Sequence, residues 1–170
     1  MSNQISFAEP QTLTESPTPE KTKTILFVCT GNTCRSPMCA ALFNAVFAEK
    51  HGLLADSCGL CADGSPISKN AAEALSQRGI NPEGNHDYSA HRSKTVTEEL
   101  IQNAETVVGL TNRHAMELLF RFPAYASKIH VMPRDISDPY GGDLSVYLQC
   151  LSDIETALAE AFPEGGPIHE

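Results

Sequence analysis

The stretch TILFVCTGNTCRSPMC, residues 24–39, decides the fold of this chain. Residues 24–29 are almost continuously apolar, and they predict a buried parallel strand that ends at Cys29. Gly31 and Asn32 favour a turn directly after that strand. Ser36 is a good N-cap and Pro37 suits the first position of a helix, so we expect a strand, a loop and a helix start in this order.

The expected loop lies at the amino terminus of a helix predicted over 37–51, which Gly52 should end. Unpaired N–H groups and the helix dipole make such a loop a good site for a doubly charged phosphate. A thiol at Cys29 should ionise easily there and attack phosphorus, while Arg35 holds two phosphate oxygens. These residue types predict phosphoryl transfer through a covalent phosphocysteine.

Two other interpretations of this loop are weaker. A nucleotide-binding loop would need the pattern Gly-x-x-x-x-Gly-Lys-[Ser/Thr], and the loop contains no Lys. An inert buried cysteine at a strand end is the other alternative. It does not explain why an arginine and a helix start follow Cys29 at this spacing.

Composition limits the possible partners. The chain has 170 residues, is 41% hydrophobic and carries a net charge of −9. This charge argues against nucleic acid and an anionic membrane as partners, whereas phosphorylated protein substrates remain possible. No apolar run approaches the roughly 20 residues of a membrane helix. Residues 1–20 do not resemble a secretory signal. We therefore expect a cytoplasmic protein whose six cysteines are reduced thiols.

The chain is expected to hold one domain. Residues 1–22 are rich in Ser, Thr, Pro, Gln and Glu, a composition that predicts a disordered tail, with a docking segment as the alternative. The domain should span residues 23–163. Residues 164–170 are predicted to be a flexible carboxyl terminus.

Strands and helices are expected to alternate along this domain. Further strands are predicted over residues 54–57, 106–110 and 128–132. Further helices are predicted over residues 68–78, 98–103, 112–120 and 144–162, with a loop over 81–91. This alternation indicates an α/β fold: a doubly wound, four-stranded parallel sheet with helices on both faces and its site at the carboxyl ends of the strands.

A thiol nucleophile needs a proton donor for the leaving group and later a base for water, and one carboxylate can serve as both. Asp138 is our candidate because it lies in the Gly-flanked loop after the fourth predicted strand. An Asp before a Pro can also be a simple turn former. Asp135 and Asp143 are the nearby rivals for the acid role.

The motif Val-Cys-Thr-Gly-Asn-Thr-Cys-Arg-Ser-Pro-Met, with a later Asp-Pro-Tyr-Gly-Gly, resembles the low-molecular-weight protein tyrosine phosphatase family over residues 24–162. The resemblance implies an enzyme without metal or cofactor. In such an enzyme Cys29 is the nucleophile, Arg35 the phosphate clamp and Asp138 the general acid and then base. It also implies that Asn32 and Ser36 hold the loop and the thiolate, with Ser57 and His91 as supports. The residues expected at the phosphate or substrate are Thr30, Gly31, Asn32, Thr33, Cys34, Ser36 and Tyr140.

Thr33 indicates which branch of the family to expect. Tyrosine-specific members usually carry an apolar residue at this position, and the motif with a Thr is similar to the bacterial protein arginine phosphatases. A hydroxyl can accept an N–H of a phosphoarginine guanidinium, whereas a branched alkyl group would leave that donor unpaired, at about 1 to 3 kcal/mol. Tyr140 can stack on a guanidinium or on a phenol, so a tyrosine phosphatase stays the alternative.

Three other cysteines and one histidine each have two possible roles. Cys34 can capture an oxidised Cys29 as a reversible disulfide, or it is a packed thiol. Cys58 and Cys61 are read as small loop residues rather than as a metal or redox pair. His114 is expected to be a surface cap of the helix over 112–120, with a minor substrate role as the alternative.

Two other functional classes fit the motif less well. An arsenate reductase would need a relay thiol beyond the second helix, and residues 79–94 contain no Cys. A non-catalytic phosphoprotein-binding module would be expected to lack the nucleophile or the acid. Both Cys29 and Asp138 are present.

Overall fold

The computed structural model describes residues 21–164. The tail predicted over 1–22 and the flexible end predicted over 164–170 therefore lie almost wholly outside the described residues. The strands are β1 (Lys23–Cys29), β2 (Leu53–Gly59), β3 (Thr106–Gly109) and β4 (Ile129–Val131). The helices are α1 (Arg35–Val46), α2 (Ala48–His51), α3 (Lys69–Gln77), α4 (Glu98–Asn103), α5 (Asn112–Arg121) and α6 (Leu144–Ala161), and the short 3₁₀ turns are η1 (Gly84–His86), η2 (Tyr88–Ala90) and η3 (Pro123–Lys128).

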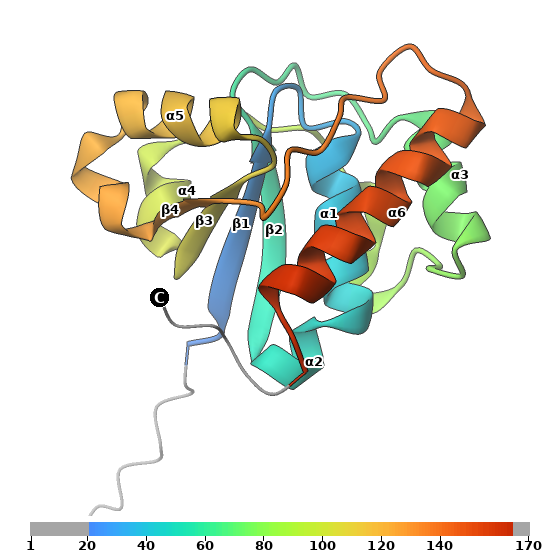
Figure 1. Cartoon of the computed structure of the whole chain (residues 1–170), viewed down its shortest axis with the longest axis horizontal. Helices are drawn as coiled ribbons and strands as arrows, with labels where there is room; N and C mark the ends of the chain where they lie inside the picture. Colours follow the sequence, from blue (N-terminus) through green and yellow to red (C-terminus); the bar gives the residue numbers. More distant parts are fainter. Residues whose placement is uncertain (1–20, 165–170) are drawn as a thin grey trace, which may run out of the picture.

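The four strands form one parallel sheet in the order β2-β1-β3-β4. Helices α1, α3 and α6 cover one face of the sheet, and α4 and α5 cover the other (Figure 1). The predicted fold class is confirmed. The carboxyl end of β1 is central in the sheet: Cys29 is paired with Gly59 of β2, and the preceding Val28 with Gly109 of β3.

Strand β1 is buried on both faces, which explains its continuous apolar sequence. Ile25 and Phe27 face the core under α1 and α6, while Leu26 and Val28 face the core under α4 and α5. Each such side chain, removed from water, contributes about 1.5 to 3 kcal/mol to folding. The two cores therefore hold Cys29 at the end of a rigid strand.

Two glycines let backbone segments approach each other at the carboxyl edge. A Cβ on Gly59 would lie 2.5 Å from the Thr30 carbonyl oxygen, so β2 can pass under the loop after β1 only with glycine there. A Cβ on Gly109 would lie 2.6 Å from the backbone nitrogen of Ala115, so α5 can begin directly above β3. These two close contacts bring the loop at Thr30 and the start of α5 to the carboxyl end of β1.

The start of the first helix differs from the prediction. Helix α1 begins at Arg35 with Cys34 as its N-cap residue and no side-chain cap, so Ser36 lies inside the first turn. An anion loop leaves its first amides free for a ligand, which removes the need for a side-chain cap. The helix predicted over 37–51 is also interrupted at Phe47, where α1 ends and α2 begins.

Other boundaries agree with the sequence more closely. Ser68, Thr97 and Thr111 are the N-caps, and their side chains accept hydrogen bonds from the first turns of α3, α4 and α5. Gly52 ends α2 in the left-handed conformation, with φ of 63°. The loop predicted over 81–91 contains η1 and η2, which the polar sequence gave no reason to expect.

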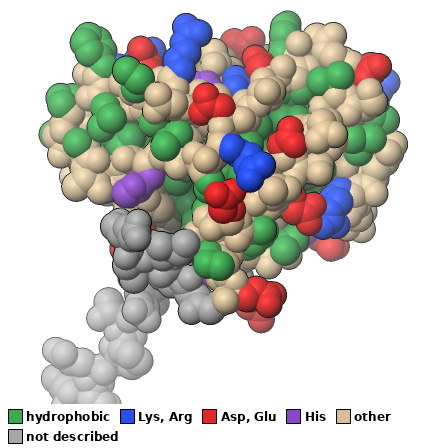
Figure 2. Space-filling view, in the orientation of Figure 1, with side chains coloured by type: hydrophobic (Ala, Val, Ile, Leu, Met, Phe, Trp, Pro, Cys, Tyr) green, Lys and Arg blue, Asp and Glu red, His purple; other side chains and the backbone are tan. Residues whose placement is uncertain are grey.

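The outer surface carries charges of both signs. On the face shown in Figure 2, Asp and Glu side chains are interspersed with Lys and Arg, and no continuous basic surface is seen there. Part of the mixture is paired, as in the ion pairs Arg78–Glu155 and Arg134–Glu160 (3.0 Å for the latter). None of the helices in residues 21–164 has the length and apolar character required to cross a lipid bilayer.

Candidate active site

The loop between β1 and α1 curls around a cavity of about 250 Å³ at the carboxyl edge of the sheet. The loop itself supplies most of the wall, and the long loop before α6 supplies the rest. The lining residues are Cys29, Thr30, Gly31, Asn32, Thr33, Cys34, Arg35, Asp138 and Tyr140. Nearly all residues predicted to contact phosphate or substrate thus meet at one cavity, the exception being Ser36, which lies behind the loop.

Cys29 is 2% exposed, and its sulfur lies 2.9 Å from the Ser36 hydroxyl oxygen. That oxygen accepts a hydrogen bond of 2.8 Å from the Asn32 side-chain amide. The Ser36 proton therefore has two possible acceptors, the Cys29 sulfur and the Cys58 carbonyl oxygen at 3.3 Å. A thiolate is the stronger acceptor, so this hydroxyl is placed to stabilise the charged form of Cys29.

Asn32 is fully buried and adopts the left-handed conformation with φ of 58°. Besides Ser36, its side-chain amide donates to the Ser57 hydroxyl at 3.0 Å, and its side-chain oxygen accepts from the Lys94 backbone N–H at 3.0 Å. His91 donates from Nε2 to the Asn32 carbonyl oxygen at 2.7 Å. Ser57 and His91 therefore lie where the family resemblance expects loop supports.

The His91 ring is neutral at neutral pH. Burial lowers its pKa below the usual value, more than the hydrogen bond to the Asn32 carbonyl raises it. A neutral imidazole donates to this carbonyl when its proton is on Nε2. The support is therefore present throughout the neutral pH range.

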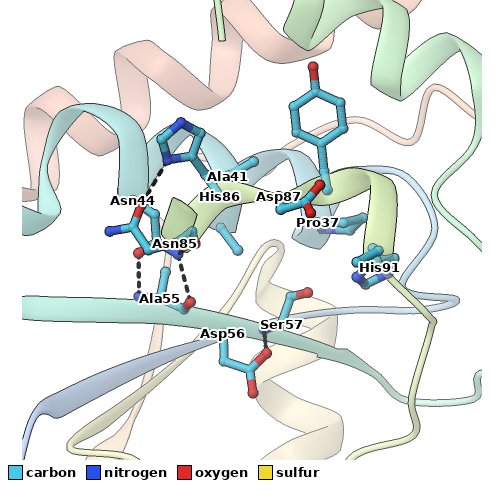
Figure 3. Close-up of a pocket in the computed structure, with 13 residues that line it drawn as sticks. Pro37, Ala41, Asn44, Ala55, Asp56, Ser57, Asn85, His86, Asp87 and His91 are labelled. Carbon is cyan, nitrogen blue, oxygen red and sulfur yellow. Dashed lines mark hydrogen bonds between the residues drawn. The ribbon is translucent and has the colours of Figure 1, made fainter. Parts of the chain in front are cut away.

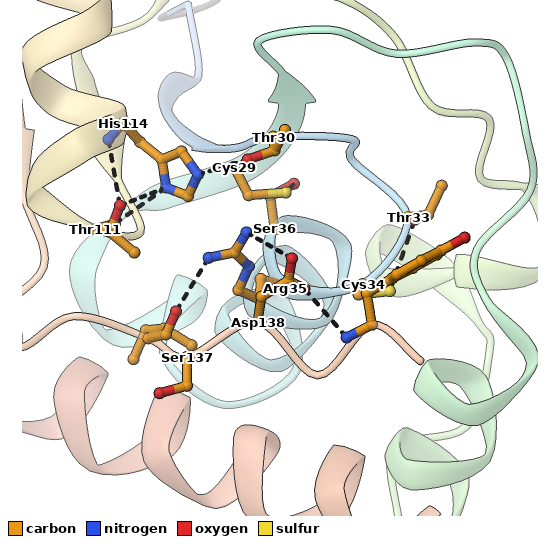
Figure 4. A network of polar contacts seen from close by, with 12 residues as sticks. Cys29, Thr30, Thr33, Cys34, Arg35, Ser36, Thr111, His114, Ser137 and Asp138 are labelled. Atoms are coloured by element: carbon orange, nitrogen blue, oxygen red, sulfur yellow. Dashed lines mark hydrogen bonds and ion pairs between the residues drawn. The ribbon is translucent and has the colours of Figure 1, made fainter. Parts of the chain in front are cut away.

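Arg35 is nearly buried, with 7% of its side chain exposed. One guanidinium nitrogen donates to the Ile136 carbonyl oxygen at 3.1 Å, and another lies 3.5 Å from an Asp138 carboxylate oxygen. Figure 4 shows the guanidinium between the Cys29 loop and the loop of Asp138. Since a guanidinium has five donors, several remain for the oxygens of a bound phosphate.

The three candidate carboxylates differ in their partners. Asp135 accepts from the backbone N–H of Asn112 at 2.8 Å, at the start of α5. Asp143 is the N-cap of α6, and hydrogen bonds from Ser145 and the first turn lower its pKa. Asp138 alone of the three lines the cavity, and 54% of its side chain is exposed. Geometry therefore favours Asp138.

Thr33 and Tyr140 form the outer wall of the cavity. Thr33 is half-buried, and its carbonyl oxygen accepts from the Ser68 backbone N–H at 2.9 Å. Tyr140 is 80% exposed. Both residues, with Gly31, also line an adjoining hollow that residues 61–69 complete. Substrate atoms beyond the phosphate can thus continue from the cavity into this hollow.

Cys34 is a packed, buried thiol in the structure. Its sulfur lies 3.3 Å from the Tyr147 hydroxyl, 3.5 Å from the Ser68 hydroxyl and 3.6 Å from the Thr33 hydroxyl. All six cysteines are free. The reversible disulfide between Cys29 and Cys34 stays a prediction, and forming it would require the sulfur of Cys34 to leave Tyr147.

Cys58 and Cys61, which form the Cys-x-x-Cys pair, differ in their exposure to solvent. Cys58 is not a loop residue as predicted: it lies in β2, fully buried, and burial raises the pKa of its thiol to about 12. Cys61 is exposed. Among residues 21–164 no three His, Cys, Asp or Glu side chains gather as they would around a metal ion.

His114 is also placed differently from the prediction. It caps α5 as expected, but it is 3% exposed rather than on the surface. Its Nδ1 lies against Thr111 and its Nε2 lies 3.0 Å from the Thr30 hydroxyl (Figure 4). The spacing Thr-x-x-His was the available signal for the cap. The contact with Thr30 is not local, so the sequence could not reveal it.

A second hollow, of about 220 Å³, lies beside the supports of the loop. Ser57 and His91 form one side of it, and Asn44 and Asn85 form the other (Figure 3). The Asn44 amide is fully used there, because it donates to the carbonyls of Ala55 and Asn85 and accepts from the Ala55 N–H. This hollow therefore belongs to the scaffold behind the loop.

Known proteins share this architecture. Residues 24–164 match the family model described as low molecular weight phosphotyrosine protein phosphatase. The chain belongs to this family. A protein-arginine-phosphatase of Bacillus subtilis (strain 168) is 36% identical over 148 residues, which cover 80% of this chain and 92% of the relative.

Solved structures agree with this assignment. The low molecular weight protein tyrosine phosphatase from T. tengcongensis superposes with a TM-score of 0.73 at 36% identity, covering 81% of this chain and 96% of that one. An arginine phosphatase, solved as a cysteine-to-serine mutant with a phosphorylated active-site serine, superposes with a TM-score of 0.69 at 33% identity, covering 79% and 90%. The strand, loop and helix described above are thus those of a phosphatase family.

Proposed function

We propose that this chain is a cysteine-dependent protein phosphatase that hydrolyses phosphoarginine on proteins. Cys29, Arg35 and Asp138 carry the chemistry in this proposal. The cavity in which these three side chains meet at the end of β1 is the observation that supports it most. We further propose that the enzyme needs no metal or cofactor and works in the cytoplasm.

In the first step the Cys29 sulfur attacks phosphorus, so that an S–P bond forms as the P–N bond of phosphoarginine breaks. Asp138 gives its proton to the departing guanidine nitrogen. Arg35 and the loop amides stabilise the charge that develops on the phosphoryl oxygens. The products of this step are arginine and a phosphocysteine.

In the second step water attacks the phosphocysteine. Asp138, now a carboxylate, takes the proton of the water as the new P–O bond forms and the S–P bond breaks. The bonding electrons return to the Cys29 sulfur, and the Ser36 hydroxyl at 2.9 Å stabilises the resulting thiolate. Phosphate then leaves the cavity.

Thr33 supports phosphoarginine as the substrate. Its side chain belongs to the outer wall of the cavity, where the group attached to the phosphate must pass. The relative from Bacillus subtilis is named a protein-arginine-phosphatase, which agrees with this choice. A tyrosine phosphatase is the competing function, because exposed Tyr140 suits either substrate.

The test compares kcat/KM for one peptide sequence carrying either phosphoarginine or phosphotyrosine. We expect the unchanged protein to prefer phosphoarginine, and Thr33→Ile to reduce this preference roughly tenfold because a guanidinium N–H loses its acceptor. Thr33→Ser is the matched control and should keep the preference. Equal rates on both peptides, or an unchanged preference in Thr33→Ile, would refute the substrate assignment.

A further inference from the structure

His114 makes one contact that the cap of α5 does not require. Its Nδ1 accepts the Thr111 backbone N–H at 3.2 Å, and this satisfies the helix start. Its Nε2 lies 3.0 Å from the hydroxyl of Thr30, 84 residues away in the sequence. Thr30 belongs to the loop around the cavity. The ring therefore connects the start of α5 to the wall of the candidate active site.

The hydrogen positions on this ring follow from its partners. Because a backbone N–H can only donate, Nδ1 must be the acceptor and Nε2 must carry the hydrogen. Nε2 then donates to the Thr30 hydroxyl oxygen. Burial, and after it the positive charge of Arg35, lowers the pKa of His114 to about 4, so the ring keeps this neutral form at neutral pH.

The hydrogen bond from His114 limits which further hydrogen bonds the Thr30 hydroxyl can form. The oxygen has two lone pairs and one hydrogen, and His114 occupies one lone pair. One lone pair and the hydrogen remain for a partner on the exposed side, where Thr30 lines the cavity. Without His114 the Thr30 side chain would be free to rotate. With His114 its hydroxyl oxygen is held in place and keeps one lone pair for a donor on the cavity side.

We propose that His114 is a positioning residue that holds the Thr30 hydroxyl oxygen at the cavity, where its remaining lone pair accepts a guanidinium N–H of the substrate. Thr30 then becomes a second determinant of phosphoarginine preference beside Thr33. This inference rests on the proposed function. A phosphate ester of tyrosine has no N–H next to phosphorus, so this lone pair finds a donor only on the phosphoramidate.

Two substitutions of His114 test the contacts of its two ring nitrogens separately. In His114→Asn the short side chain can still accept the Thr111 N–H, but it is too short to reach Thr30. In His114→Gln the longer side chain places its amide N–H near the position of Nε2. The first variant removes the contact with Thr30 and keeps the cap, and the second is designed to restore the contact.

The experiment measures kcat/KM for a phosphoarginine peptide and for a small aryl phosphate, and reports their ratio. We expect the ratio to fall about tenfold in His114→Asn and in Thr30→Val, and by less than threefold in His114→Gln. The double variant His114→Asn, Thr30→Val should lose no more than either single variant, because both break the same contact. Thermal unfolding of each variant shows how much of the change is loss of stability.

The outcomes distinguish this inference from the proposed function. If the unchanged protein does not turn over phosphoarginine, both are wrong. If it does, but His114→Asn lowers kcat/KM for both substrates equally, His114 has only a structural role and this inference alone is overturned. Additive losses in the double variant would also overturn it.

Discussion

The surroundings of Asp138 explain why it, and not a neighbouring aspartate, is proposed as the general acid. Three aspartates lie within residues 135–143, and two of them are committed to the starts of helices α5 and α6. Asp138 caps no helix, although its Oδ1 accepts the Tyr140 backbone N–H at 3.2 Å, as in a turn. It lies 3.5 Å from the Arg35 guanidinium and is open to the cavity, where a leaving group would depart.

We expect Asp138→Asn to lower kcat by about 100-fold, because an amide can neither give nor take the proton in the two steps. Steady-state kinetics on a phosphoarginine peptide measures this loss. As the matched control, Asp143→Ala should lower the free energy of unfolding by about 1 kcal/mol through loss of the α6 cap. Its kcat should change far less. A larger kcat loss in Asp143→Ala than in Asp138→Asn would contradict the assignment.

The sequence could predict some site residues and not others. The spacing of Cys29, Arg35 and the later Asp-Pro pair places three functional groups at one sheet edge once the strands are recognised. The residues alone predicted Ser36 as a cap, and only the family resemblance implied that it holds the thiolate, because its contact with Cys29 depends on where the helix starts. The contacts of Thr30 with His114 and of Cys34 with Tyr147 join distant segments, so no local pattern encodes them.

At the scale of elements, β1 was predictable because residues 25–29 are buried on both faces of the sheet and are all apolar. The start of α1 was less predictable, because the anion loop replaces the usual side-chain cap. No Gly or Pro in the sequence indicates the interruption at Phe47. Phe43 and His51, which lie on either side of Phe47, both pack against Phe162 after α6, and this is a tertiary effect.

His114, in the first turn of α5, should make the free energy of unfolding depend on pH. Burial of the ring, and after it the charge of Arg35, lowers the pKa of His114 from 6.5 to about 4 on folding. The unfolded chain therefore binds the proton first as the pH falls. The stability contributed by neutral His114 is present above about pH 6.5 and is lost as the pH falls toward about 4, by up to about 3 kcal/mol.

Urea unfolding at pH 7 and pH 4.5 measures this effect against the His114→Gln variant, whose side chain does not titrate. We expect the unchanged protein to lose on the order of 2 kcal/mol more than the variant between these pH values. Carboxylates shared by both proteins cancel in the comparison. Equal losses would mean that the His114 pKa is not lowered by folding.

At the scale of the whole molecule, the alternation of strands and helices predicted the parallel sheet and the edge that carries the site. It did not predict the strand order β2-β1-β3-β4, because pairing between distant strands leaves no local signal. The order matters for the site. It puts Gly59 and Gly109 on the two sides of β1, so that the residue-30 loop and α5 can both approach Cys29.

We propose that residues 23–163 form the phosphatase domain, since the sheet, both cores and the cavity lie within them. Removal of residues 1–22 should therefore change the free energy of unfolding by less than about 0.5 kcal/mol. It should leave kcat/KM for a phosphoarginine peptide within about twofold, which is less than 0.5 kcal/mol in free energy. A loss beyond either limit would show that these residues belong to the working domain.

The most direct test concerns phosphoryl transfer to position 29. The Cys29→Ser protein is incubated with one protein substrate carrying phosphoarginine and with the same substrate carrying phosphotyrosine, and the attached phosphate is mapped by mass spectrometry. A related arginine phosphatase carries a phosphorylated active-site serine after this kind of exchange. We expect phosphate at position 29, acquired faster from phosphoarginine, and none in Cys29→Ala. Phosphate at another position, or transfer from phosphotyrosine alone, would contradict the proposed function.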